Sequence, residues 1–159
     1  SSVGISRVTD PTELAAAKAA VVLDPLVNLP ASFDALGARL DNAARLQRAG
    51  VVVVFSMTGL APHFAHKVRQ SAGNAVAHGM PWDAALAGLT ANPATVFGLG
   101  ARRGRIETGM LADLVLWNGD PLEVTRAADQ VWVGGKPMSM RSRQTELLDR
   151  YLPQAARQP

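Results

Sequence analysis

The chain has 159 residues, of which 48% are hydrophobic, and it carries a net charge of +3. This length is sufficient for one domain with a sizeable core. No apolar run approaches the roughly 20 residues that a membrane span requires, and the first ten residues lack the regions of a signal peptide, so we expect a soluble protein. Cysteine is absent, which excludes disulfides, zinc–thiolate sites and thiol nucleophiles and leaves cytoplasm and periplasm both open.

Much of the positive charge lies in two short arginine clusters, at residues 102–105 and 141–143. Basic clusters can hold nucleic acid or phosphate, but neither of these is interleaved with aromatic residues. Solvated loops are therefore the better interpretation, and we expect no nucleic-acid partner.

The first hundred residues alternate predicted helices with apolar strands. Caps, first-turn prolines and terminal glycines mark the helix ends. The predicted helices cover approximately residues 10–18, 32–49, 63–78, 81–86 and 92–97.

Two strong strands lie between these helices, at Val21–Leu23 and Val51–Phe55. The second is a continuous β-branched run, which is typical of a strand buried on both faces of a parallel sheet. A weaker strand is possible at Val3–Ile5. A closed barrel needs eight strands, so we expect the missing strands to come from elsewhere.

After Gly100 the pattern changes to short strands separated by turns. We expect strands near Ile106, at residues 112–117 and in a hairpin at residues 130–138 whose turn is Gly134-Gly135. The predicted domains are therefore a partial barrel at residues 1–100, a partial sandwich at 101–141, and a helix with a tail at 142–159. The apolar residues of this last helix are Leu147, Leu148, Tyr151 and Leu152.

Three stretches together resemble the closing segment of the amidohydrolase superfamily, in particular its imidazolonepropionase-related branch. The resemblance covers roughly residues 12–152. The stretches are LTANPA at 89–94, GRIETG at 104–109 continued by ADLVLW at 112–117, and NGDPL at 118–122 continued by VWVGGK at 131–136.

The resemblance implies an α/β fold, namely the last βα units of a TIM-like (β/α)8 barrel followed by part of a small β-sandwich. Val21–Leu23 would be barrel strand seven and Val51–Phe55 strand eight. The upstream part of the same protein, or a second chain, would complete the barrel. Because unpaired sheet edges associate, we also expect a homo-oligomer.

The family's metal ligands lie at the carboxyl ends of the barrel strands, as do the active sites of such barrels. The first strand usually supplies a His-x-His pair, and the end of strand eight an Asp that binds metal and accepts a proton from the attacking water. This chain contains no His-x-His, and Thr58 stands where that Asp is expected. We therefore expect a divalent metal, Zn²⁺ by resemblance, in the parent protein and none in this chain alone.

The candidate catalytic residues near this rim are Asp24, Thr58 and His63, and the candidate metal ligands are His63 and His66. Asp24 directly follows a strand, although Asp-Pro is also a common turn starter. The two histidines have i, i+3 spacing, which places them on one helix face. Two histidines fall short of the three or four ligands of a zinc site.

Other polar residues of these stretches occupy cap or turn positions, so we interpret them as structural. Asp113 is expected to hold the turn at residues 107–109 through side-chain to backbone hydrogen bonds. The set consists of Asn92, Glu107, Asp113 and Asp120.

Three functions follow from these observations. The first hypothesis, from the resemblance, is that the parent protein is an amidohydrolase-type enzyme that cleaves a carbon–nitrogen bond other than a peptide bond and that this chain alone is inactive. Alternatively, the chain is part of a non-catalytic relative that acts as a partner or structural subunit, for which Thr58 is the main support. A carbohydrate- or peptide-binding module unrelated to the superfamily is the third hypothesis.

Overall fold

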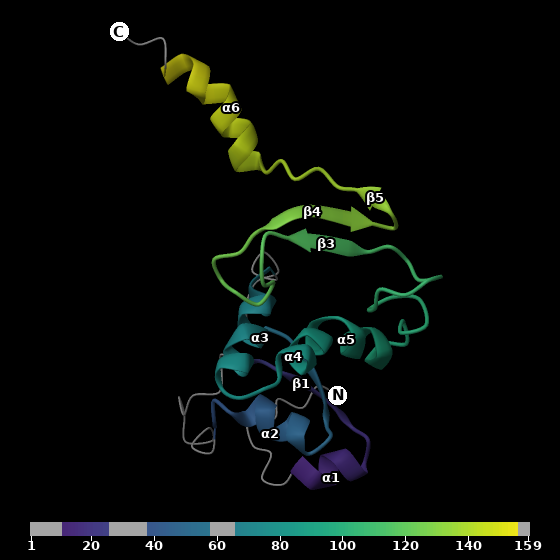
Figure 1. Cartoon of the computed structure of the whole chain (residues 1–159). Helices are drawn as coiled ribbons and strands as arrows, with labels where there is room; N and C mark the ends of the chain where they lie inside the picture. Colours follow the sequence, from purple (N-terminus) through teal and green to yellow (C-terminus); the bar gives the residue numbers. More distant parts are fainter. Residues whose placement is uncertain (1–10, 26–37, 58–65, 156–159) are drawn as a thin grey trace.

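A computed structural model describes residues 11–25, 38–57 and 66–155 of the chain (Figure 1). Helices and two strands come first, and a small sheet and a final helix follow. The elements are α1 (Pro11–Ala16), β1 (Ala20–Leu23), α2 (Asn42–Arg48), β2 (Val52–Phe55), α3 (Val68–Ala77), α4 (Trp82–Leu89), α5 (Ala91–Val96), β3 (Leu114–Trp117), β4 (Ala128–Val133), β5 (Lys136–Pro137) and α6 (Arg143–Ala155).

Strands β1 and β2 form a parallel pair in which Val21 faces Val53 and Leu23 faces Phe55. These four side chains lie on one face of the pair and are buried in the main core with residues of α2, α3 and α4. Burying each such side chain stabilises the fold by roughly 1.5–3 kcal/mol. The parallel pairing predicted from the β-branched strand is confirmed.

The helix predicted at residues 32–49 is wrong in its middle, because residues 38–41 are not helical and α2 begins only at Asn42. Arg39 and Asp41 form a two-pronged ion pair, with Nε–Oδ1 at 2.8 Å and Nη2–Oδ2 at 3.0 Å. Residues two apart in a helix do not face each other, so this pair is incompatible with a helix here. The predicted start of the helix lies outside the described residues.

Helices α3, α4 and α5 follow β2, but the helix predicted from residue 63 begins as α3 only at Val68, and His66 and Lys67 before it form a 3₁₀ turn. Gly79 separates α3 from α4 with a φ of 93°. Helix α4 packs closely on β2: a Cβ at Gly88 would lie 2.8 Å from the Phe55 ring. The predicted cap of α5 is wrong, because Thr90 is the N-cap and Asn92 lies within the helix. The side chain of Asn92 instead donates a hydrogen bond from Nδ2 to the Val53 carbonyl at 2.8 Å.

Strands β3, β4 and β5 form an antiparallel sheet in that order. Its hairpin turn is the predicted glycine pair, with positive φ at both Gly134 and Gly135, as a two-residue turn of type I′ requires. The strand predicted near Ile106 is wrong; this residue lies among turns and is 88% exposed. Val115 and Leu116 point to opposite faces and are both largely exposed, so neither face of the sheet is fully covered by described residues.

Asp113 holds a different turn from the predicted one at residues 107–109. Its Oδ1 accepts the Gly134 N–H at 2.8 Å, and its Oδ2 lies 2.7 Å from Arg103 Nη1. The carboxylate therefore joins the start of β3 to the hairpin. One arginine of the 102–105 cluster is thereby used within the fold.

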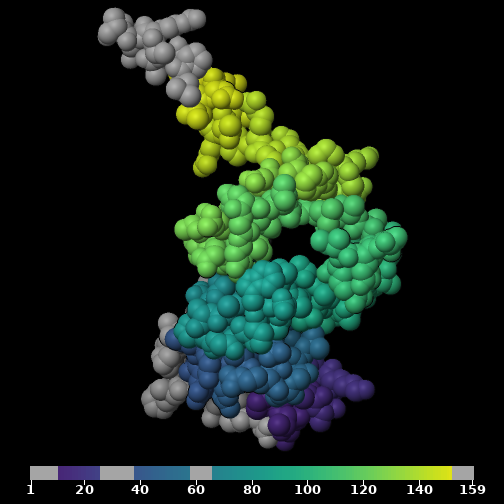
Figure 2. Space-filling model, in the orientation of Figure 1, coloured from purple at the N-terminus to yellow at the C-terminus, as the bar shows by residue number. Residues whose placement is uncertain are grey.

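Arg69 of α3 connects the helical part of the molecule to the segment between β3 and β4. Its guanidinium lies 5.1 Å from the centre of the Trp117 ring, a distance typical of cation–π contacts. Figure 2 shows the green segment around residues 110–130 resting on the teal helices, with a hollow between them. The guanidinium donates to four carbonyl oxygens, those of Pro121 at 3.1 Å, Glu123 at 2.6 Å, Val124 at 3.3 Å and Arg126 at 2.8 Å.

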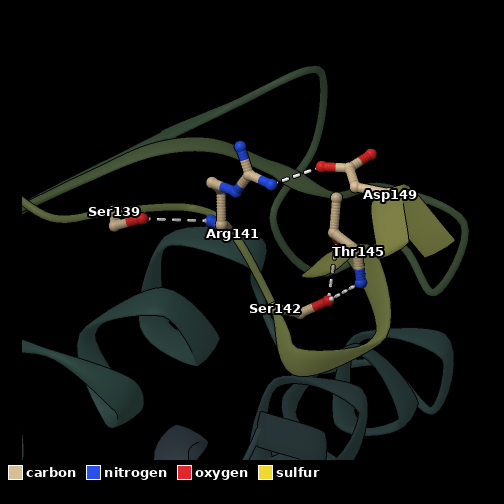
Figure 3. A network of polar contacts seen from close by, with 5 residues as sticks. All are labelled: Ser139, Arg141, Ser142, Thr145 and Asp149. Carbon is tan, nitrogen blue, oxygen red and sulfur yellow. Dashed lines mark hydrogen bonds and ion pairs between the residues drawn. The ribbon is translucent and has the colours of Figure 1, made fainter. Parts of the chain in front are cut away.

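The predicted C-terminal helix is confirmed as α6, which extends away from the rest of the chain (Figure 1). Ser142 caps its first turn by accepting the Thr145 N–H at 3.2 Å, and Arg141 forms an ion pair with Asp149 (Figure 3). The apolar residues Leu148 and Tyr151 are more than half exposed.

We predict that Arg69→Lys lowers the free energy of unfolding by about 1–3 kcal/mol, because an ammonium cannot reproduce the planar fork that reaches several carbonyls and stacks on Trp117. The measurement is urea or thermal unfolding followed by circular dichroism. Arg48→Lys is the control; Arg48 donates to the Ala44 carbonyl within its own helix, and its replacement should cost less than about 0.5 kcal/mol. Equal losses in the two variants would contradict the role of Arg69.

Candidate functional site

The carboxyl ends of β1 and β2 meet at one edge of the parallel pair. The N–H of Ser56, the first residue after β2, donates to the Leu23 carbonyl at 3.0 Å. Asp24 is the first residue after β1 and therefore lies beside Ser56. Active sites of α/β barrels form at this end of the strands, so the described chain places Asp24 where a site residue is expected.

Asp24 is buried, with 8% of its surface exposed. Carboxylates are rarely buried without a partner, because removal of the charge from water is costly, and Asp24 does have an interaction partner in the fold. This burial indicates that the fold holds the Asp24 carboxylate in place, whereas an aspartate that merely begins an Asp-Pro turn would be exposed. The roles predicted for Asp24 remain predictions.

The other candidates are described only in part. His66 is exposed and lies with Lys67 in a single 3₁₀ turn directly before α3. Thr58 and His63 lie outside the described residues. The replacement of the strand-eight Asp by Thr58, and the pairing of His63 with His66, therefore stay predictions.

The described residues do not form a complete metal centre. Within residues 11–25, 38–57 and 66–155, no group of three or more His, Asp or Glu side chains is arranged to hold a metal ion. Of the predicted rim residues, only Asp24 and His66 belong to this part of the chain. A zinc site needs three or four ligands, so these two do not suffice.

A cavity of about 280 Å³ lies elsewhere, between α3, α4 and the segment that follows β3. Its wall includes Trp82, whose Nε1 donates to both carboxylate oxygens of Asp120 at 3.0 Å. Asp120 Oδ1 also accepts the Leu122 N–H at 2.9 Å. Trp82 and Asp120 thus fix the turn after β3, as the cap-or-turn interpretation of Asp120 predicted.

Sequence reasoning missed two side chains that make long-range hydrogen bonds, Arg69 and Asn92. Arg69 reaches carbonyls more than 50 positions away, and Asn92 reaches Val53. A lone arginine on a helix carries no local signal for such a role. For Asn92, the preceding Thr90 is itself a good N-cap residue, which leaves the asparagine side chain available for another partner.

Comparison with known proteins places these elements in a family context. The model of the amidohydrolase family matches residues 49–138, which is more than half of the chain and spans β2 to β5. An amidohydrolase from Thermotoga maritima is similar in structure, with 29% sequence identity and a TM-score of 0.72. The similarity covers 82% of this chain and 34% of that protein, so this chain spans about a third of the length of its solved relative.

Two further proteins are similar over different extents. The amidohydrolase tasK of Hapsidospora irregularis is 48% identical over 58 residues, which are 36% of this chain and 6% of that protein. An adenosine deaminase from Xanthomonas campestris, solved with bound zinc, covers 92% of this chain and 39% of its own length, with a TM-score of 0.56. At 21% identity, this second likeness concerns the fold alone.

Among the described residues, no helix is both long enough and apolar enough to cross a bilayer.

We predict that Asp24 and Thr58 lie on the same rim. Because the chain has no cysteine, the double variant Asp24→Cys/Thr58→Cys carries the only two thiols, and a short bifunctional reagent should join them within one chain. Asp24→Cys/Arg48→Cys is the control, because Arg48 precedes β2 and lies toward its opposite end, several residues away at roughly 3.3 Å per residue. Cross-linking of the control but not of the test pair would refute the shared rim.

Proposed function

This chain belongs to the amidohydrolase family, and from that premise we propose that it is the C-terminal portion of a metal-dependent enzyme that hydrolyses a carbon–nitrogen bond other than a peptide bond. The observation that carries the proposal is the family match across residues 49–138. The matched region contains both β2, which belongs to the parallel pair, and the antiparallel sheet β3–β5. The series of motifs at residues 89–136 favours the imidazolonepropionase-related branch.

In this proposal β1 and β2 are barrel strands seven and eight, and β3–β5 are part of a small β-sandwich. Two features support this assignment: the parallel pairing of β1 with β2 and the incomplete cover of both faces of the second sheet. The upstream part of the same protein, or a second chain, would supply the remaining strands. It would also supply the histidines that hold the metal, Zn²⁺ by likeness to the family.

We assign to Asp24 the task of accepting a proton at the rim. An uncharged hydroxyl at Thr58 is a poor proton acceptor, whereas Asp24 is a buried carboxylate at the end of the neighbouring strand. A general base must lie within reach of the proton that it accepts, and a carboxylate held at this rim would meet that requirement. His63 would contact substrate or metal, with His66 as the second candidate ligand.

The isolated chain is proposed to be inactive and to associate with itself. The residues available to it as ligands are Asp24, His63 and His66, which lack the supporting shell that fixes a metal site. Two parallel strands also leave open edges, and open edges associate.

We predict that the purified chain contains no stoichiometric zinc and shows no metal-dependent hydrolysis of a panel of lactams and amides. Elemental analysis of protein prepared without added chelator or metal measures the first, and product formation the second. About one tightly held metal ion per chain would overturn this prediction if it were lost in His63→Ala. His78→Ala is the matched control, because His78 lies at the end of α3 and contacts the Asn74 carbonyl.

In the full-length protein, Asp24→Asn is predicted to lower kcat by roughly 10²–10⁴-fold, the usual contribution of a general base. The amide keeps the shape of the side chain but cannot accept the proton. Metal content should remain that of the wild type, because the metal is assigned to upstream histidines. Asp83→Asn on the exposed side of α4 should retain full activity; an unchanged kcat in Asp24→Asn would remove Asp24 from the reaction.

A further inference from the structure

The carboxyl-terminal half of β2 is held by β1 on one side and by α4 and α5 on the other. Successive residues of a strand direct their N–H and C=O groups to opposite edges. The Ser56 N–H donates to the Leu23 carbonyl at 3.0 Å, so Val53 and Phe55 direct their backbone groups away from β1. On that second edge, the Val53 carbonyl accepts a hydrogen bond from Asn92 Nδ2 at 2.8 Å.

Gly88 of α4 makes a second contact on the same side. A Cβ at Gly88 would lie 2.8 Å from Cε2 of the buried Phe55 ring and 3.3 Å from the Val53 oxygen. Only a residue without a side chain allows the helix to come so close. Because α4 and α5 also pack against each other, Gly88 and Asn92 hold β2 as parts of one helical corner.

These two contacts lie directly before the rim. The peptide group that follows Val53 carries the carbonyl that Asn92 binds and, at its other end, an N–H directed toward β1, so it is held from both sides. The same short strand leads to Ser56 beside Asp24. A shift of the strand toward either side would therefore break one of the bonds that flank it and would move the rim. Displacements of about 1 Å at an active site can lower the rate roughly 10²-fold.

We propose that Asn92 and Gly88 are positioning residues that fix the carboxyl end of β2 and, through it, the rim beside Asp24. The inference rests on the proposed function, because it assumes that the reaction takes place at this rim. A carbonyl oxygen has two lone pairs, so the bond from Asn92 leaves the Val53 oxygen able to pair with a further barrel strand as well. The corner thus sets the position of β2 without closing its edge.

The exchange rate of the Ser56 amide hydrogen reports directly on the rim, because this N–H forms the bond to Leu23. In Asn92→Asp the side chain keeps its shape but has no N–H to donate. The Ser56 amide of this chain should then exchange roughly 5- to 10-fold faster, the loss expected for one hydrogen bond. The Ala75 amide in α3 should change less than about 2-fold, because the loosening is local. Hydrogen exchange followed by NMR measures both rates.

Asn118→Asp is the matched control. The side chain of Asn118 accepts the Ala127 N–H at 3.1 Å, and a carboxylate can accept the same bond, so the Ser56 rate should equal that of the wild type. Asn92→Ala removes the donor without adding a charge and replaces Asn92→Asp if the latter does not fold. An unchanged Ser56 rate in the folded Asn92 variant, or an equal increase at Ser56 and Ala75, would overturn the proposal.

Gly88→Ala tests the second contact. The added methyl group meets the Phe55 ring, whereas alanine is otherwise a better helix former than glycine. Faster exchange at Ser56 would therefore come from the displaced strand and not from a weaker α4. We expect an increase similar to that in Asn92→Asp, and an unchanged rate would remove Gly88 from the positioning role.

Kinetics of the full-length protein separate positioning from mere stability. Asn92→Asp should lower kcat by roughly 10- to 100-fold and leave KM unchanged, while Asn118→Asp should alter neither. Faster exchange at Ser56 with an unchanged kcat would make the Asn92 bond purely structural and refute its positioning role. If the wild-type full-length protein hydrolyses none of the lactams and amides, the proposed function fails, and the exchange rates alone decide whether Asn92 and Gly88 fix the end of β2.

Discussion

The parallel pairing of β1 with β2 is the constraint on which the rest of this chain depends. It brings the carboxyl ends of both strands to one edge, and it places Val21, Leu23, Val53 and Phe55 on a single buried face. Parallel sheets are normally covered on both faces, yet Val22 and Val52 on the opposite face remain substantially exposed. The incomplete second face and the rim that carries Asp24 are thus two consequences of the same pairing.

A second set of contacts holds the antiparallel sheet to the helices. The guanidinium of Arg69 is surrounded by carbonyl oxygens of the segment between β3 and β4, and Trp82 of α4 binds Asp120 in the same segment. Charged groups that make several hydrogen bonds contribute more than neutral ones. These contacts cross the boundary near residue 100, where the sequence changes from alternating helices and strands to short strands and turns, and the family match runs through both parts.

Local signals in the sequence predicted most of the elements, and the failures have a common cause. The β-branched run of β2, the glycines that end helices and the Gly134-Gly135 turn are each determined by neighbouring residues. Two interactions behave differently: the Arg39–Asp41 pair, which excludes a helix at residues 38–41, and the bond from Asn92 to Val53. Each of these side chains has several possible partners in the sequence. Which partner it binds depends on the folded structure, so local sequence patterns do not predict it. The rim could be predicted as far as Asp24, because its position follows from the end of a strand.

The position of Asn92 bears on how a complete barrel would close against β2. The asparagine amide occupies the outward carbonyl of Val53, in the middle of the strand, whereas the next outward-pointing residue, Phe55, lies at its carboxyl end. A carbonyl oxygen has two lone pairs, so this bond leaves the oxygen able to accept a second hydrogen bond from a neighbouring strand. The asparagine thus fastens α5 to the middle of β2 without closing that edge, and the same strand leads at its carboxyl end to Ser56 beside Asp24.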